Sequence, residues 1–145
     1  MSLSEGEKKS VATLLGDVPL FSSLKQKNLV SVVNASTKRS FDSGETIARQ
    51  GDSGVAFYMI LSGQVEVRRG KRLLSKLGRG QFFGEMALFD QQPRSADVVA
   101  VEKTTCLLLT SWAFEGFVKA HSDVSLMVIK EIVRRLRDTD KALSE

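Results

Sequence analysis

Glycines divide the middle of the chain into short segments, and this spacing constrains the fold more than any other feature. Between Lys38 and Thr110 the dividing residues are Gly44, Gly51, Gly54, Gly63, Gly70, Gly78, Gly80, Gly84 and Pro93. The intervening runs are rich in β-branched, aromatic and aliphatic residues, as strands are: residues 46–47, 56–61, 65–67, 73–77, 98–101 and 104–109. Parallel strands need crossover helices, for which these runs leave no room. The pattern therefore predicts an antiparallel sandwich or barrel.

Helical patterns flank this β-rich middle. Ser4 and Glu7 have the spacing of a capping box, and apolar residues at helical spacing follow until Pro19. Further helices are predicted over residues 25–35, 111–120 and 122–143, with Ser122 as the cap of the last. An apolar stripe marks that last helix: Ile129, Ile132, Leu136 and Leu143. With 145 residues, the chain suits a single domain, helical over 4–36, β-rich over 37–110 and helical again over 111–143.

The counts of cysteine and histidine exclude several kinds of site. The chain has one cysteine, Cys106, and one histidine, His121, so it has no disulfide framework and no Cys/His zinc cluster. Cys106 lies in an apolar predicted strand and is interpreted as an inert core residue, and His121 as a surface or capping residue. Gly51-Asp52-Ser53-Gly54 matches the segment around a serine-protease nucleophile, but the histidine follows far downstream and we interpret the segment as a turn. We expect no enzyme, no metal and no cofactor.

The charge and hydropathy of the chain bear on its partners. The net charge is +4, and no apolar run approaches the roughly 20 residues that span a bilayer. Because the N-terminus is also polar, we expect a cytoplasmic protein without membrane contact. Basic residues are densest over 68–72, between two apolar runs. No helix-turn-helix or aromatic stacking motif accompanies them, so the interpretation is a solvated hairpin tip rather than a nucleic-acid contact.

Residues 82–96 combine groups that can bind a small anion. Gly84 allows close backbone approach, and residues 85–88 can form one helical turn whose free N–H groups attract an anion. If the following loop folds back, the guanidinium of Arg94, the hydroxyl of Ser95 and backbone amides surround the same point. Glu85 suits a phosphate joined to a sugar, because a carboxylate accepts a hydrogen bond from a ribose hydroxyl. The chemistry alone equally allows Glu85 and Arg94 to pair with each other at the surface.

This stretch resembles the phosphate-binding cassette of the cyclic nucleotide-binding domain family. The family pattern is F-G-E, an apolar pair, a short loop and then P-R-S/T/A-A; Phe83-Gly84-Glu85 and Pro93-Arg94-Ser95-Ala96 match it. Pro19-Leu20-Phe21 and the turns that begin at Gly44, Gly51 and Ser62 also fit the family framework. The resemblance covers residues 18–143 and implies an eight-stranded antiparallel β-roll (jelly roll) with helices at both ends.

The resemblance implies a role for each cassette residue. Arg94 would pair with the cyclic phosphate, and Ser95 with the backbone N–H groups of Met86 and Ala96 would complete the anion site. Glu85 would accept a hydrogen bond from the ribose 2′-hydroxyl, and Gly84 would permit the close approach. Phe83 and the strand residue Val65 would form the pocket wall. The additional acid Asp97 is expected to face solvent.

The family mechanism implies allosteric regulation, in which the ligand closes the cassette and the C-terminal helix moves onto the base. By similarity to an Arg-Arg-Leu stretch in family members, the lid candidates are Arg135, Thr139 and Asp140. Ser95 stands where Thr often accompanies guanine preference, and the lid residues can accept from an adenine amino group, so cyclic AMP is favoured over cyclic GMP. The same helix could form a homodimer, and we expect no DNA-binding domain in this chain.

Two other interpretations stay open at this point. The chain could be a regulatory or interaction module of the same fold that binds another effector or none. It could also be an enzyme of the related cupin architecture, although that architecture uses a cluster of metal-binding histidines and this sequence has only His121.

Overall fold

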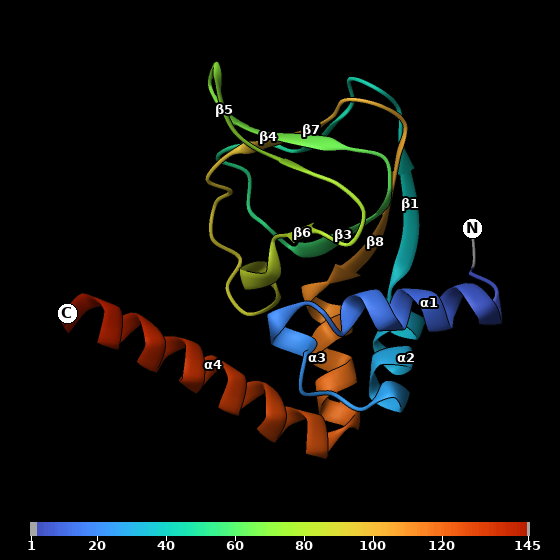
Figure 1. Cartoon of the computed structure of the whole chain (residues 1–145), viewed down its shortest axis with the longest axis vertical. Helices are drawn as coiled ribbons and strands as arrows, with labels where there is room; N and C mark the ends of the chain where they lie inside the picture. The colour runs from blue at the N-terminus through green and yellow to red at the C-terminus, as the bar shows by residue number, and fades with distance from the viewer. Residues whose placement is uncertain (1–2, 145) are drawn as a thin grey trace.

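Eight antiparallel strands form two four-stranded sheets in the computed structural model, which describes residues 3–144 and the side chains as far as residue 140. One sheet has the order β1-β8-β3-β6 and the other β2-β7-β4-β5. The two sheets make an open β-roll, not a closed barrel (Figure 1). The strands are β1 (Thr37–Phe41), β2 (Thr46–Ala48), β3 (Ala56–Ser62), β4 (Val65–Arg69), β5 (Arg72–Leu77), β6 (Phe82–Phe83), β7 (Asp97–Ala100) and β8 (Thr104–Thr110).

Helices lie before and after the roll in the chain and gather on one side of it (Figure 1). They are α1 (Glu5–Leu15), the 3₁₀ turn η1 (Pro19–Phe21), α2 (Gln26–Ala35), α3 (Ser111–Ala120) and α4 (Ser122–Ser144). A second 3₁₀ turn, η2 (Glu85–Leu88), interrupts the roll between β6 and β7. The predicted capping box is present: the Ser4 hydroxyl accepts from the Glu7 N–H, and the Glu7 carboxylate accepts from the Ser4 N–H, both at 3.2 Å.

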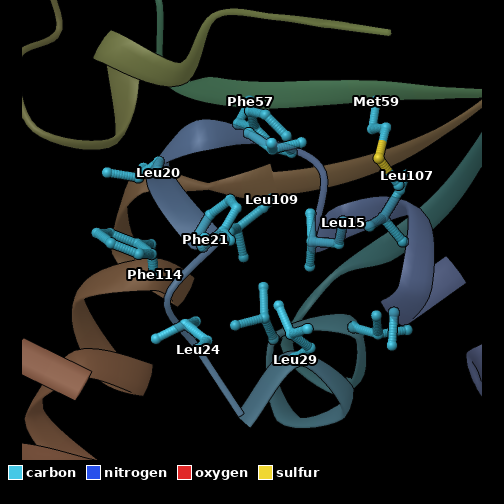
Figure 2. Packing of buried hydrophobic residues seen from close by; sticks show 14 of the residues in the cluster. Leu15, Leu20, Phe21, Leu24, Leu29, Phe57, Met59, Leu107, Leu109 and Phe114 are labelled. Carbon is cyan, nitrogen blue, oxygen red and sulfur yellow. The ribbon is translucent and has the colours of Figure 1, made fainter. Parts of the chain in front are cut away.

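Strand β3 explains how one sequence serves two hydrophobic cores. Successive side chains of a strand point to opposite faces, and six residues of β3 in a row are buried. Phe57 and Met59 pack against the helices, where Phe21 meets Phe57 edge-to-face at 5.7 Å (Figure 2). Tyr58 and its neighbours of the same parity point into the roll instead. The strand therefore holds the helices on one side and the interior of the roll on the other.

The structure confirms the predicted fold class and most element positions. Two strands, β1 and β6, were not among the predicted runs. The last helix begins at Ser122, so this residue is the first of α4 and not its cap as predicted. Cys106 is fully buried, as the core interpretation requires. His121 ends α3, and its Nδ1 lies 2.9 Å from the carbonyl oxygen of Phe117. None of the helices within residues 3–144 is long and apolar enough to cross a membrane.

Candidate functional site

The side chain of Arg94 is partly buried and packs in space between two glycines, Gly54 and Gly84. Its Nη2 donates a 2.8 Å hydrogen bond to the carbonyl oxygen of Ala56, at the start of β3. Burial lowers the pKa of the Arg94 guanidinium, and nearby Tyr58 acts in the opposite direction. No carboxylate in the described part of the chain forms an ion pair with Arg94. Among the described residues, the only hydrogen-bond partner of the Arg94 guanidinium is therefore a neutral carbonyl.

The glycines on either side of Arg94 make room for its side chain. A Cβ at Gly84 would lie 2.5 Å from Nη1 of Arg94 and 2.7 Å from the Ala56 oxygen, and one at Gly54 would lie 2.9 Å from Nε. Gly84 also has φ +80°, a conformation that other residues rarely adopt. The close approach predicted at Gly84 is therefore, in this structure, an approach of the Arg94 guanidinium and the Ala56 carbonyl to the backbone.

Aromatic side chains form one wall next to this cation. Phe83 and Tyr58 face each other across the β3–β6 pair and stack at 4.8 Å with 9° between their planes. Burial raises the pKa of Tyr58, whereas the positive charges of Arg94 and Arg39 lower it. Val65, the other predicted wall residue, is 0% exposed and packs inside the roll. Of the two predicted wall residues, Phe83 has the exposed surface that a ligand could touch.

Glu85 forms an ion pair with the last helix rather than with Arg94. Arg135 Nη2 of α4 donates a 2.6 Å hydrogen bond to Glu85 Oε1. The Glu85 side chain is only 17% exposed, and its second oxygen, Oε2, is buried without a hydrogen-bond partner among the described residues. The simple surface pair between Glu85 and Arg94 is therefore not the arrangement in this structure, because each residue has a different partner.

The residues around the cation offer free backbone donors. Ser95 is exposed and Ala96 is buried, and among the described residues their N–H groups have no hydrogen-bond acceptor. The N–H of Met86, the second residue of η2, also has none there, and its side chain is 65% exposed. Free N–H groups next to a cation attract a small anion. The backbone donors predicted from the sequence are thus without an acceptor in the part of the chain that the structure describes.

Two of the three lid candidates, Arg135 and Thr139, line a separate hollow. A cavity of about 430 Å³ lies between η1, η2 and α4. Glu85, Met86, Arg135 and Thr139 are among its lining residues. The Thr139 hydroxyl donates to the Arg135 carbonyl at 3.0 Å, and Asp140 follows in the same helix. Glu85 therefore links the cassette turn to the surface that carries the predicted lid.

Sequence reasoning missed four contributors to the site. The sequence indicates only an ordinary turn at Gly54, and Ala56 contributes only a backbone carbonyl, which no sequence motif marks. Tyr58 lies beside Phe83 because β3 pairs with β6, and the sequence indicates only a solvated hairpin tip at Arg69. Arg69 Nε instead donates a 3.0 Å hydrogen bond to the Ser95 carbonyl. The Asp97 side chain is on the β7 face opposite to buried Val98, and its carboxylate accepts from the Gln50 N–H at 2.7 Å.

The architecture is that of a two-sheet β-roll domain with helices at both ends. The family model described as "Cyclic nucleotide-binding domain" matches residues 38–121, more than half of the chain. The chain therefore belongs to the cyclic nucleotide-binding domain family. Within residues 3–144, no group of three or more His, Cys, Asp or Glu side chains could hold a metal ion.

Individual proteins of this family show how far the similarity extends. The chain is 35% identical over 130 residues to the "Cyclic AMP receptor protein" of Thermus thermophilus, which covers 86% of this chain and 60% of that protein. The N-terminal domain of a transcriptional regulator from Streptomyces coelicolor A3(2) superposes with a TM-score of 0.85 at 26% identity, covering 90% of this chain and 94% of the other. The regulatory domain of Toxoplasma gondii PKA, solved with cAMP, superposes with a TM-score of 0.73 at 30% identity. This match covers 82% of this chain and 47% of the other. This chain thus spans less than two thirds of the Thermus relative.

Proposed function

We propose that the chain is a non-catalytic sensing module that binds a cyclic nucleotide, with cyclic AMP favoured over cyclic GMP. One observation carries the proposal: Arg94 is a partly buried cation whose only partner among the described residues is a neutral carbonyl. Burying a charge is costly unless an opposite charge is supplied, and a phosphate supplies one. Membership of the family and the relatives named for cyclic AMP support the same class of ligand.

In this proposal the two ends of the cassette bind different parts of the nucleotide. The phosphate pairs with Arg94 and accepts hydrogen bonds from Ser95 and from the N–H groups of Met86 and Ala96. The ribose 2′-hydroxyl donates to Oε2 of Glu85, which is buried and has no hydrogen-bond partner in the described part of the chain. A buried acceptor without a partner destabilises the protein, so a hydroxyl that reaches it gains more than an ordinary surface contact would.

The ion pair between Glu85 and Arg135 supports an allosteric role for α4. A ligand shifts a conformational equilibrium only if it interacts differently with the two states. A ribose that binds Glu85 changes the environment of Arg135, and through it the position of α4 over the cavity that Thr139 also lines. We place Arg135, Thr139 and Asp140 on the base side of the bound nucleotide.

The preference for cyclic AMP rests on both ends of the base. Ser95 keeps the hydroxyl of a threonine but lacks the methyl that restricts its rotamer, so its selection of guanine is weak. Thr139 or Asp140 can accept from the adenine amino group, where guanine presents a carbonyl and an ionised Asp140 opposes it. We expect a preference of roughly five- to thirtyfold, the size of one neutral hydrogen bond gained or lost.

Self-association through α4 is a further part of the proposal. The sequence left open whether its apolar stripe packs entirely on the roll. In the structure the helix is only partly covered: Val124 and Val128 pack against the core, whereas Ile129 and Leu136 are 56% and 61% exposed. The side chain of Leu143 lies outside the described residues. An exposed apolar face of this kind suits a second copy of the chain. Sedimentation with and without cyclic AMP measures whether the chain dimerises. A protein that is monomeric under both conditions contradicts self-association through α4.

A calorimetric titration tests the nucleotide proposal. Cyclic AMP and cyclic GMP are titrated separately into wild type, Arg94→Ala and, as a charge-matched control, Arg72→Ala on exposed β5. We expect Arg94→Ala to lose roughly 30-fold to several-thousand-fold in affinity, since truncating one side of a buried charge pair costs about 2–5 kcal/mol. Arg72→Ala should bind as wild type does. A folded Arg94→Ala protein that binds cyclic AMP within threefold of wild type contradicts the assignment.

A further inference from the structure

Arg69 connects the β4–β5 hairpin to the loop that carries Arg94. Its Nε donates a 3.0 Å hydrogen bond to the carbonyl oxygen of Ser95, 26 residues further along the chain. Backbone pairing between β4 and β7 reaches Arg68, which lies opposite Asp97. The Arg69 side chain therefore extends the contact between these segments beyond the end of the ladder, onto residues that precede β7.

The oxygen that accepts this hydrogen bond belongs to the peptide group that joins Ser95 to Ala96, beside the proposed anion site. The Ser95 C=O and the Ala96 N–H are parts of one planar trans peptide, so they point in opposite directions. A hydrogen bond that fixes the oxygen consequently fixes the direction of the N–H. The Ala96 N–H has no acceptor among the described residues, and it leads away from Arg69. A cationic donor on the oxygen also polarises the amide and strengthens its N–H as a donor.

We propose that Arg69 is a positioning residue of the anion site: by holding the Ser95 carbonyl it fixes the Ser95–Ala96 peptide, and with it the loop that carries the Arg94 and Ser95 side chains proposed to bind the phosphate. The inference rests on the proposed function, because it assumes that a phosphate binds beside Arg94. It also makes the β4–β5 hairpin part of the binding site, where the sequence indicated only a solvated tip.

Neighbouring arginines allow the hydrogen bond to be separated from simple positive charge. Arg72 lies opposite Arg69 in the β4–β5 register, is exposed, and carries the same charge on the same hairpin. Arg68 forms a 2.8 Å ion pair with Glu66. If the hairpin acted only through its electrostatic field, removing Arg72 would weaken binding about as much as removing Arg69.

The first experiment measures affinity for cyclic AMP and for inorganic phosphate in wild type, Arg69→Ala and Arg72→Ala. We expect Arg69→Ala to weaken binding of both anions about 3- to 10-fold, the effect of one hydrogen bond, and Arg72→Ala to change it less than twofold. Because Arg69 is exposed, its removal should leave the thermal midpoint unchanged. Equal losses in the two variants, or no loss in Arg69→Ala, overturn the inference.

The second experiment follows the Ala96 amide directly by ¹H–¹⁵N correlation spectra of the ligand-free protein. Arg69→Ala removes the donor from the Ser95 carbonyl and should shift the Ala96 resonance, whereas Arg72→Ala should not. Arg69→Lys keeps a cationic donor and should return the resonance part of the way to its wild-type position. An unshifted Ala96 resonance overturns the inference even where affinity falls. If wild type binds neither cyclic nucleotide while the Ala96 shift depends on Arg69, the proposed function fails and the contact itself stands.

Discussion

Arg135 Nη2 donates to Glu85 Oε1 at 2.6 Å, so one ion pair joins the η2 turn to α4 across 50 residues of sequence. The pair is largely shielded, since the two side chains are 33% and 17% exposed. The second oxygen of the same carboxylate is buried and accepts no hydrogen bond from residues 3–140. Glu85 therefore contacts the helix with one oxygen, while the other is a buried acceptor that the proposed contact with a ribose hydroxyl would satisfy.

The strength of this pair can be measured by a double-mutant cycle with Glu85→Gln and Arg135→Gln. Contacting residues couple by about 0.5–3 kcal/mol in the free energy of unfolding, and we expect a value in that range. The control cycle combines Glu85→Gln with Arg134→Gln, because Arg134 is on the same helix but pairs with Glu131 and Asp138. Urea unfolding of the ligand-free variants gives both values. Additive effects for Glu85 and Arg135 would show that the pair has no role in joining α4 to the cassette.

Replacing Gly84 by alanine should destabilise the protein more than the same substitution at Gly44, a glycine with a similar backbone conformation but open space where a Cβ would lie. Gly44 has φ +88°, and nothing lies within 4 Å of a Cβ built on it. The left-handed backbone alone costs about 1–2 kcal/mol in Gly44→Ala. Gly84→Ala should lose about 1–3 kcal/mol more, because its Cβ collides with the Ala56 carbonyl and displaces Arg94. Only Gly84→Ala should weaken cyclic AMP binding; equal stability losses in the two variants contradict this account.

Arg94 should determine whether a nucleotide stabilises the protein. At a ligand concentration of 100 times Kd, wild type should gain about 2.7 kcal/mol in free energy of unfolding. Arg94→Ala at the same concentration should gain almost nothing. In the absence of ligand the two proteins should differ by only about 0.5–1.5 kcal/mol, the net worth of the hydrogen bond to the Ala56 carbonyl. Chemical unfolding with and without cyclic AMP measures both differences, and an equal gain in the two proteins would mean that the nucleotide binds elsewhere.

Ser95→Thr tests the origin of nucleotide selectivity. The added methyl restricts the hydroxyl rotamer, so the affinity for cyclic GMP should rise relative to cyclic AMP by roughly three- to tenfold. Ser95→Ala is the matched control, because it removes the hydroxyl and should weaken both nucleotides. Competition against a fluorescent analogue measures the ratio. A ratio that does not change in Ser95→Thr would place selectivity entirely at the base side of the pocket.

Cys106 should be chemically silent in the folded protein. It is fully buried, and burial raises the pKa of its thiol from 9.0 to about 12. A raised pKa means that the fold favours the protonated thiol, so this contribution to stability is complete below pH 9.0 and disappears as pH rises towards about 12. The stability advantage of wild type over Cys106→Ala should shrink over that interval. Alkylation at pH 8 should label Cys106 in denaturant and not in the native protein; rapid native labelling contradicts the assignment.

Local signals in the sequence predicted the elements that depend on neighbouring residues. The capping box at Ser4 and Glu7 and the glycine turns between strands each act over a few positions, and the structure has them as predicted. Strand β6, with only Phe82 and Phe83, is too short to show a period and exists because it pairs with β3. It was therefore not predicted from its own residues.

The site shows the same division between local and distant determinants. The cassette motif marked Glu85 and Arg94, whose residue types and spacing are readable in the sequence. The contacts of these residues depend on chain pairing: Arg94 bonds to a carbonyl of β3, and Glu85 to a helix that begins 37 residues later (85 to 122). Val65 was expected at the pocket surface, yet its register places it fully inside the roll. A strand position can be read from sequence more easily than the face and depth of its side chain.

The open form of the roll has a consequence for how copies of the chain meet in concentrated solution. An open sheet has edge strands with unpaired backbone groups, which can pair with an edge of another molecule and start aggregation. β5 is such an edge, and it exposes Leu73 and Leu74 between the basic side chains of Arg72 and Lys76. Two β5 edges that approach each other bring like charges together. The positive charge of this hairpin therefore acts against strand-to-strand aggregation, so such pairing does not compete with the self-association proposed for the face of α4.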